Sequence, residues 1–424
     1  MPTRNAQIKE FQPGKSMMRE KCSTRCLQGF YIVVCMHISM MLLSGFTKGL
    51  GVMLATLREE FIADTWMIGS LIAGMNAVAG FAGPISGPLH GSFGTRTVVV
   101  ISGLLSGASV ILSSFSTSVF HVALTLSLLT GPGLSIISIL TRAMAGRHFT
   151  TGYAIATGIG SSGHAVGLVV VGPLTQVLLD TYGWRGALLL LGAISLHLGA
   201  FGFLLRSAPE STQKENEYLP LVSTEEEEPA ADQSRIPNGE KKSRFHIKKD
   251  AIIARLNLLG WTICCCAKFW IAFPVFGCDY ITCDLWLMYF VVYAETKGFS
   301  GYEAVTFTLA GGIGNIVFKI VLGLILDRGL LNLRLSLFST IIASSLGLLT
   351  LPWINTYWMM MVNAFLFQGL SGMTATMSDI YTRDLFGAED LVPAFSWIGV
   401  FTAALALAFG FFPGKPRLYF KNAC

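Results

Sequence analysis

Long apolar runs separated by short polar segments dominate the chain from about residue 29 to residue 413. A helix needs roughly 20 apolar residues to cross a bilayer core of about 30 Å, and on that measure the runs predict an all-α polytopic membrane protein with about eleven spans. Six expected spans precede a long polar stretch and five follow it. They cover approximately residues 29–52, 66–89, 97–116, 120–141, 152–179, 184–206, 266–293, 304–326, 334–352, 356–378 and 391–413.

The polar stretch at 207–250 contains four consecutive glutamates and a basic run, and it has too little apolar area to fold. We expect it to be a disordered cytoplasmic linker between a six-helix half at 29–206 and a second half of about five helices at 251–413. Residues 1–28 lack the apolar core of a signal peptide. Since lysine and arginine gather in the loops on that side, the N-terminal segment is expected in the cytoplasm, and 414–424 form a short tail.

Composition narrows the class of protein further. Of the 424 residues, 52% are apolar and only 13% are charged, whereas soluble proteins carry about a quarter charged residues. The net charge of +5 comes from loops between apolar runs, so it reports membrane topology and not nucleic-acid binding. The nine cysteines show no zinc-site spacing, and no nucleophile elbow or phosphate loop occurs. We therefore expect no enzyme, catalytic residue, cofactor or metal.

Two short loops indicate an internal repeat. GPLHGSFGTR at 87–96 follows the second expected span, and GLILDRG at 323–329 follows the eighth. Both resemble the signature GxxxDRxGR of the major facilitator superfamily. The second copy keeps Gly323, Asp327 and Arg328, whereas the first keeps the glycines, Gly87 among them, and Arg96 but has Gly91-Ser92 in place of the acid and base. The resemblance implies two six-helix halves related by an axis along the membrane normal, with these residues at a cytoplasmic gate. It also implies that a twelfth helix is missing here, through truncation or an alternative ending.

Three further segments resemble the monocarboxylate transporter family within that superfamily. HFTTGYAIATGIGSSGHAVG at 148–167 is similar to its fifth-span signature YFxxRRxLAxGxAxxGxxxG, YGWRGALLL at 182–190 to its entry into the sixth span, and FTKGLGV at 46–52 to its first-span pattern FPKSxGV. The resemblance implies a plasma-membrane carrier of small organic anions. Some members of the family need a single-span chaperone, so such a chaperone is a candidate partner besides the lipid bilayer.

Lysines inside apolar runs are the main candidates for binding. A charge at mid-bilayer costs about 2.5–3.5 kcal/mol, so it normally faces the bundle interior. In the resemblance to the monocarboxylate transporter family, Lys48 stands at the position of the lysine thought to meet the substrate carboxylate or a proton. Asn315 and Lys319 stand at the positions where the family's eighth span has aspartate and arginine. We expect these three residues to bind the substrate. The alternatives are that Lys48 reaches the interface and binds nothing, and that Lys319 is interfacial or forms a structural pair with Asp279.

The replacement of aspartate by Asn315 removes the carboxylate that would accept a coupled proton, because asparagine does not titrate. His37, His164 and Asp279 are candidates to replace it or to form a charge pair, although a membrane histidine is more often a packing residue. The sequence therefore favours a secondary transporter of monocarboxylates or related solutes by alternating access, with facilitated or atypically coupled transport. The alternative is a non-transporting or truncated receptor-like or regulatory relative.

Overall fold

The computed structural model describes residues 13–62, 74–205 and 259–410. Regular structure within these ranges is helical. The expected linker at 207–250, the tail at 414–424 and any twelfth helix lie outside the described residues. The elements are α1 (Pro13–Glu60), η1 (Gly83–Ile85), α3 (Ser86–Ser113), α4 (Val119–Thr125), η2 (Leu126–Thr130), α5 (Gly131–His148), α6 (Tyr153–Val166), η3 (Gly167–Val171), α7 (Gly172–Leu204), η4 (Trp261–Cys265), α9 (Ala267–Thr296), α10 (Gly301–Asp327), α11 (Leu333–Thr350), η5 (Leu351–Trp353), α12 (Tyr357–Phe386) and α13 (Leu391–Gly410).

Seven helical stretches of the described chain are long and apolar enough to cross a membrane, or eight if the bent α9 is counted as one span. Two of the seven, Gly74–Ser113 and Tyr153–Leu204, have 40 and 52 residues. At 1.5 Å per residue the longer one would extend about 78 Å, far more than one bilayer core. Each contains a glycine with positive φ where two helices join, Gly94 (φ 75°) and Gly183 (φ 68°). The expected total of about eleven spans stays a prediction.

Local sequence explains where several helices begin and where their geometry changes. Ser300 and Glu303 form a reciprocal capping box at the start of α10, which satisfies two backbone N–H groups. The π-helical segments η2 and η3 each end immediately before a Gly-Pro pair that opens the next α-helix. Proline lacks the N–H that an α-helical ladder requires, so the preceding turn widens to accommodate it. Helix geometry therefore changes in the middle of these two stretches.

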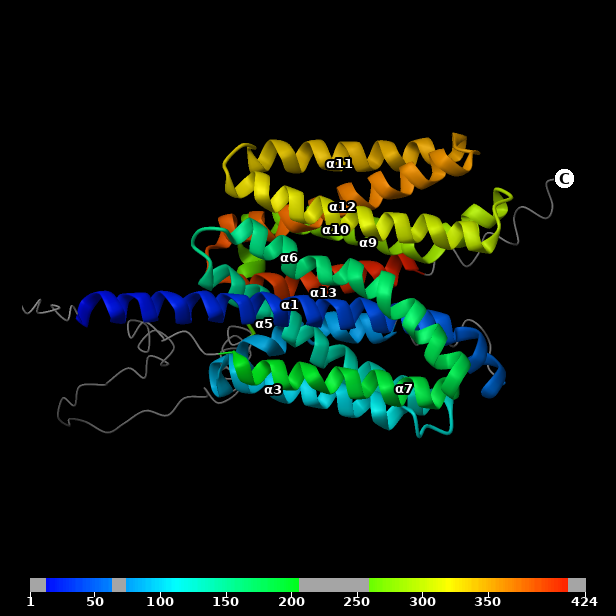
Figure 1. The fold of residues 1–424 in the computed structure, drawn as a ribbon, viewed down its shortest axis with the longest axis horizontal. Coiled ribbons are helices and arrows are strands. Elements are labelled where there is room, and N and C mark those ends of the chain that lie inside the picture. Colours follow the sequence, from blue (N-terminus) through cyan, green and yellow to red (C-terminus); the bar gives the residue numbers. More distant parts are fainter. Residues whose placement is uncertain (1–12, 63–73, 206–258, 411–424) are drawn as a thin grey trace, which may run out of the picture.

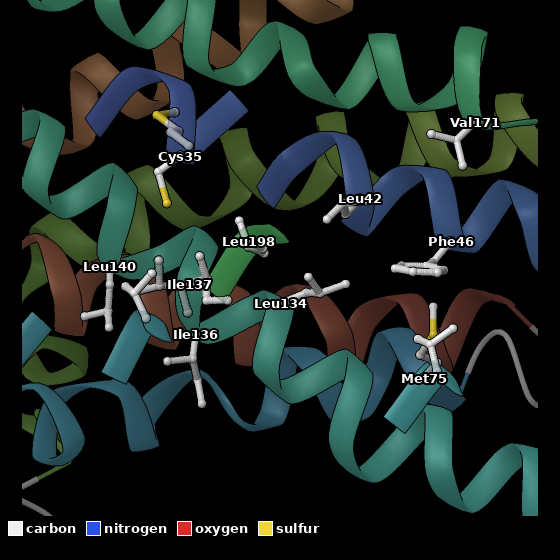
Figure 2. Close-up of a cluster of buried hydrophobic side chains, with 14 of the residues drawn as sticks. Cys35, Leu42, Phe46, Met75, Leu134, Ile136, Ile137, Leu140, Val171 and Leu198 are labelled. Carbon is white, nitrogen blue, oxygen red and sulfur yellow. The ribbon is translucent and has the colours of Figure 1, made fainter. Parts of the chain in front are cut away.

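The helices form two bundles; in Figure 1, α10, α11 and α12 of the second lie above α6, and α1, α3, α5 and α7 of the first lie below it. The first contains α1 to α7, with α3 packed along α7, and the second contains α9 to α13, with α12 packed between α10 and α11. The first bundle has a continuous apolar core (Figure 2), in which side chains of α1 such as Leu42 and Phe46 meet Leu134 and Ile137 of α5 and Leu198 of α7. The bounds that the sequence predicts for the two halves, 29–206 and 251–413, stay a prediction.

The two halves meet through a small set of helices. α6 of the first half packs against α10 and α12 of the second, and α13 of the second packs against α5 and η1 of the first. Leu391, Val392 and Phe395 of α13 extend the apolar core of the first half across this boundary. The interface is therefore built by α6 and α13. Any movement of one half relative to the other changes the contacts of residues on these two helices.

Candidate functional site

A narrow cavity lies between the two halves and collects polar side chains from five elements. Lys48 of α1 and His164 of α6 face it from the first half, while Trp286 of α9, Asn315 of α10 and Gln368 of α12 line it from the second. Its remaining walls are Ala165, Leu168, Val169, Leu287, Thr308, Leu309 and Gly312. Polar groups on an otherwise apolar concave surface between helices are typical of a binding site for a small molecule.

Lys48 is the cation of this cavity. Its aliphatic stem passes close to Gly172 at the start of α7, where a Cβ atom would lie 3.1 Å from Cγ of the lysine. The side chain is partly buried, and among the described residues no hydrogen bond or ion pair of its ammonium group is found. An unpaired ammonium group within a membrane protein is available to bind an anion.

Asn315 faces Lys48 from the other half and is tied to α12. Its amide nitrogen Nδ2 donates to the backbone carbonyl oxygen of Gln368 at 3.0 Å. Gly372, one turn further along α12, provides the room, because a Cβ atom there would lie 2.6 Å from Nδ2 of Asn315. The oxygen Oδ1 of Asn315 is buried and has no hydrogen-bond partner among the described residues.

Lys319 lies one turn further along α10 and is not among the residues that line the cavity. It is only 4% exposed, and its ammonium group donates to the carbonyl oxygen of Ser161 on α6 at 3.0 Å. The lysine in the middle of α10 therefore connects the two halves, while Lys48 and Asn315 share the cavity.

The three candidates for proton transfer occupy different environments. His164 lines the cavity beside Lys48. His37 forms a hydrogen bond through Nδ1 with the carbonyl oxygen of Ile159 at 2.8 Å, which joins α1 to α6 within one half. Asp279 accepts a hydrogen bond from the hydroxyl of Ser371 at 3.0 Å, between α9 and α12. Of these three side chains, the structure brings only His164 to the candidate binding site.

Asp327 of the second copy of the loop motif connects the halves at one end of the bundle. Its carboxylate accepts hydrogen bonds from the backbone N–H groups of Ala154 at 3.1 Å and Ile155 at 2.8 Å. These donors belong to the first turn of α6, where N–H groups lack helical partners and favour an anion. Gly323, one turn earlier, permits the contact, because a Cβ atom there would lie 2.6 Å from Cα of Ile155.

A buried ion pair reinforces the same end. Arg142 of α5 donates to Asp379 of α12 at 3.4 Å, with side chains 18% and 6% exposed, and its guanidinium lies 4.6 Å from the ring centre of Phe395 on α13. Asp379 was not among the site residues expected from the sequence, since the expected tenth span stopped at residue 378. An acidic residue within a continuing helix is the signal that could have found it.

Arginines close the same end further by binding backbone carbonyl groups of the opposite half. Arg383 of α12 donates to the carbonyl oxygen of Phe149 at 2.8 Å, and Arg147 of α5 donates to those of Ala388 and Glu389 at 3.2 and 3.0 Å. Helix ends leave such carbonyl groups without helical partners. These contacts, with the Asp327 and Arg142–Asp379 contacts, form what we call the polar gate.

The remaining motif residues are Arg96, Gly87 and Arg328. Arg96 is exposed and its guanidinium lies 5.9 Å from the ring centre of Phe203, within the same half. Gly87 is partly buried in α3, and Arg328 is the exposed C-cap of α10. Of the second copy, Asp327 contributes a side chain that crosses between the halves. No cluster of residues suited to a metal ion occurs in the described part of the chain.

The two bundles, the helices that join them and the repeated loop motif define a two-half membrane carrier fold. Residues 36–411 match the family model of the Major Facilitator Superfamily, and the chain belongs to this superfamily. The fold is similar to that of the proton:xylose symporter XylE bound to 6-bromo-6-deoxy-D-glucose, with a TM-score of 0.63 and 14% identity over 92% of this chain and 90% of that one.

The curated relatives are monocarboxylate transporters, as the sequence motifs predicted. Monocarboxylate transporter 12 of Xenopus laevis is 28% identical over 73% of this chain and 65% of that protein, and the human protein of the same name is 25% identical over 79% of this chain and 64% of that protein. Monocarboxylate transporter 11 of Mus musculus is 36% identical over 38% of this chain and 36% of that protein. The chain thus spans less than two-thirds of the length of these relatives.

Proposed function

We propose that the protein is a secondary transporter that moves monocarboxylates or related small organic anions across the plasma membrane by alternating access. The observation that carries the proposal is the ammonium group of Lys48, which lines the cavity between the two halves without a hydrogen bond or ion pair among the described residues. A bound carboxylate would supply the missing counter-ion. The names of the relatives support the same class of substrate.

The position of the polar gate supports one state of the transport cycle. All hydrogen bonds and ion pairs found between the halves, within the described ranges, lie from the level of Lys319 and Ser161 to the end where α6 begins. The distribution of lysine and arginine in the sequence predicts that this end is cytoplasmic. On that orientation the structure corresponds to a carrier closed toward the cytoplasm, and transport requires the polar gate to break after an anion binds.

The mode of coupling follows from which groups near the cavity can titrate. Asn315 replaces the carboxylate of the family pattern, and asparagine carries no proton to exchange. His164 is the titratable neighbour of Lys48 in the cavity, whereas His37 and Asp279 are engaged in hydrogen bonds elsewhere. We therefore propose facilitated transport, with His164 as the group that would mediate any dependence on external pH. Lys319 keeps the halves together through Ser161, and it can meet substrate only when α6 moves away.

The test is uptake by cells that lack endogenous carriers. A panel of labelled monocarboxylates is offered at two external pH values, with the surface amount of protein measured by biotinylation. We expect saturable uptake in which Lys48→Gln raises KM at least tenfold and Lys48→Arg retains part of the activity, because arginine keeps the positive charge. A matched control is Lys297→Gln, since Lys297 binds Pro352 and Asn355 far from the cavity.

Each outcome has a defined meaning. Saturable uptake that is independent of pH supports facilitated transport, and a steep increase at acid pH that is lost in His164→Gln supports coupling through His164. No uptake of any acid, despite normal surface expression of the chain, would refute transport and favour a receptor-like or regulatory relative.

A further inference from the structure

Three polar side chains that line the cavity each have one buried atom without a hydrogen-bond partner in the described part of the chain. They are Oδ1 of Asn315, Nε2 of Gln368 and the indole Nε1 of Trp286. The residues are 6%, 4% and 5% exposed. Three further unpartnered atoms are hydroxyls of Thr157, Ser378 and Thr402, which do not line this cavity. The unpaired amide and indole groups therefore concentrate at the candidate binding site.

Such atoms are unfavourable in a finished protein core. More than nine-tenths of buried polar groups have a partner, and each unpaired donor or acceptor carries the full cost of its desolvation. The neighbouring contacts explain why these atoms remain unpaired. Asn315 uses Nδ2 to bind the backbone of Gln368, and the Oε1 atom of Gln368 accepts from the thiol of Cys283 at 3.6 Å. Each amide is thereby held by its other atom.

The indole is fixed in a different way. Trp286 stacks on Phe290, with ring centres 4.2 Å apart, and also packs against Phe367 at 5.6 Å. Aromatic packing on both sides limits rotation of the ring, so its N–H cannot turn toward another protein acceptor. The cavity wall of the second half consequently offers two unused donors and one unused acceptor.

The cavity lining also limits the charge of whatever binds there. It contains Lys48 and His164 but no aspartate or glutamate. Asp279 lies nearby on α9 and is bound to Ser371. A ligand with an ammonium group would find no counter-ion in the lining, and a second carboxylate would meet the oxygen of Asn315. The complementary group is therefore uncharged.

We propose, building on the proposed transport function, that this site selects acids that carry an uncharged carboxamide-type group in addition to their carboxylate. The carboxylate pairs with Lys48. The carbonyl oxygen of the second group has two lone pairs for Nε2 of Gln368 and Nε1 of Trp286, and its NH₂ donates to Oδ1 of Asn315. Since all three protein atoms are buried in this state, they reach the ligand only when the cavity wall formed by α9, α10 and α12 shifts as the ligand enters.

The experiment uses three acids of the same heavy-atom count and similar shape. Succinamate ends in a carboxamide, levulinate ends in a methyl ketone that only accepts hydrogen bonds, and 4-methylpentanoate ends in an isopropyl group that does neither. Uptake and mutual competition are measured with the full chain in carrier-deficient cells. We expect kcat/KM for succinamate to exceed that for 4-methylpentanoate at least tenfold, with levulinate between them, because sites that bind polar groups reject analogues lacking them.

Variants locate the selectivity. Gln368→Met and Asn315→Leu remove the amides at nearly constant volume, and each should reduce the ratio of succinamate to 4-methylpentanoate toward one. Asn363→Leu is the matched control, because Asn363 lies on α12 and binds Gly347 and Thr350 outside the cavity lining. The control should keep the ratio of the parent chain.

The outcomes separate this inference from the transport function on which it rests. If the parent chain takes up 4-methylpentanoate as well as succinamate, and Lys48→Gln impairs both, the carboxamide inference is wrong and the transport function stands. If none of the three acids is taken up while another acid of the monocarboxylate panel is, only the carboxamide inference is wrong; if no acid is taken up by protein at the cell surface, both are wrong. A preference for succinamate that persists in Gln368→Met and Asn315→Leu would also overturn the assignment of these residues.

Discussion

The ion pair between Arg142 and Asp379 is expected to set the balance between closed and open states of the polar gate. It joins α5 of one half to α12 of the other, with atoms 3.4 Å apart and side chains 18% and 6% exposed. Solvent-exposed ion pairs contribute about 0–1 kcal/mol to stability, and a pair as buried as this one contributes more. A hydrogen bond between charged groups contributes about 1.5–3 kcal/mol. Asp379→Asn should therefore shift the equilibrium toward the open gate about 10- to 100-fold.

A disulfide across the gate can measure this shift. The hydroxyl oxygens of Ser86 on α3 and Ser396 on α13 lie 3.0 Å apart and belong to opposite halves, so these two positions are chosen for the cross-link. Both serines are replaced by cysteine in a chain whose native cysteines have been removed. The rate of oxidative cross-linking then reports the fraction of molecules with a closed gate. Asp379→Asn should lower that rate, and the ratio of closed to open molecules calculated from it should fall about 10- to 100-fold.

Two comparisons decide whether the ion pair is responsible. The exchanged pair Arg142→Asp with Asp379→Arg should recover much of the cross-linking, since the attraction is restored in reverse. Arg185→Gln is a matched control, because Arg185 and Glu60 form an exposed pair at 3.9 Å within one half. Equal cross-linking in the parent and Asp379→Asn chains would refute the reasoning, as would an Arg185→Gln effect of the same size.

Three further predictions concern α10. Asp327→Asn should lower the same cross-linking rate about threefold to tenfold, because a neutral amide binds the first turn of α6 more weakly than a carboxylate does. Gly323→Val should abolish cross-linking while leaving surface expression measurable by biotinylation, because its side chain would collide with Ile155 of α6. Ser300→Ala should destabilise the protein by about 1 kcal/mol without changing cross-linking, because it removes the capping box, and the loss is measured by thermal unfolding in detergent.

The fold could be predicted from sequence because the features that determine it are local or periodic. Apolar runs of spanning length, the polar stretch between the halves and the repeated loop motif each lie within a short window of residues. The more complete second copy of the loop motif contains Asp327, which binds α6 of the other half. Arg96 of the less complete first copy lies over Phe203 of its own half.

The partners of the candidate site could not be predicted in the same way. Asn315 and Gln368 are 53 positions apart, and Lys319 and Ser161 are 158 positions apart. Their pairing depends on how helices of the two halves approach each other, and no local pattern specifies that. Helical spacing placed Asn315 and Lys319 on one face of α10, yet the structure assigns them to different surroundings one turn apart. The sequence identified Lys48 and Lys319 as candidates, but it did not show that Lys48 lines the cavity while Lys319 binds α6 at the interface between the halves.

This division gives α6 a central position in the proposed mechanism. Its first turn binds Asp327, its middle binds Lys319 through the carbonyl oxygen of Ser161, and His164 on its last turn lines the cavity. An α-helix transmits displacement along its axis because its backbone hydrogen bonds are continuous. A bound anion would draw Lys48 and His164 toward the second half. This movement would displace α6 and strain the hydrogen bond between Lys319 and Ser161 and those between Asp327 and the first turn of α6. Occupancy of the cavity and opening of the polar gate are linked through one rigid element, and no chain of side-chain rearrangements is needed between them.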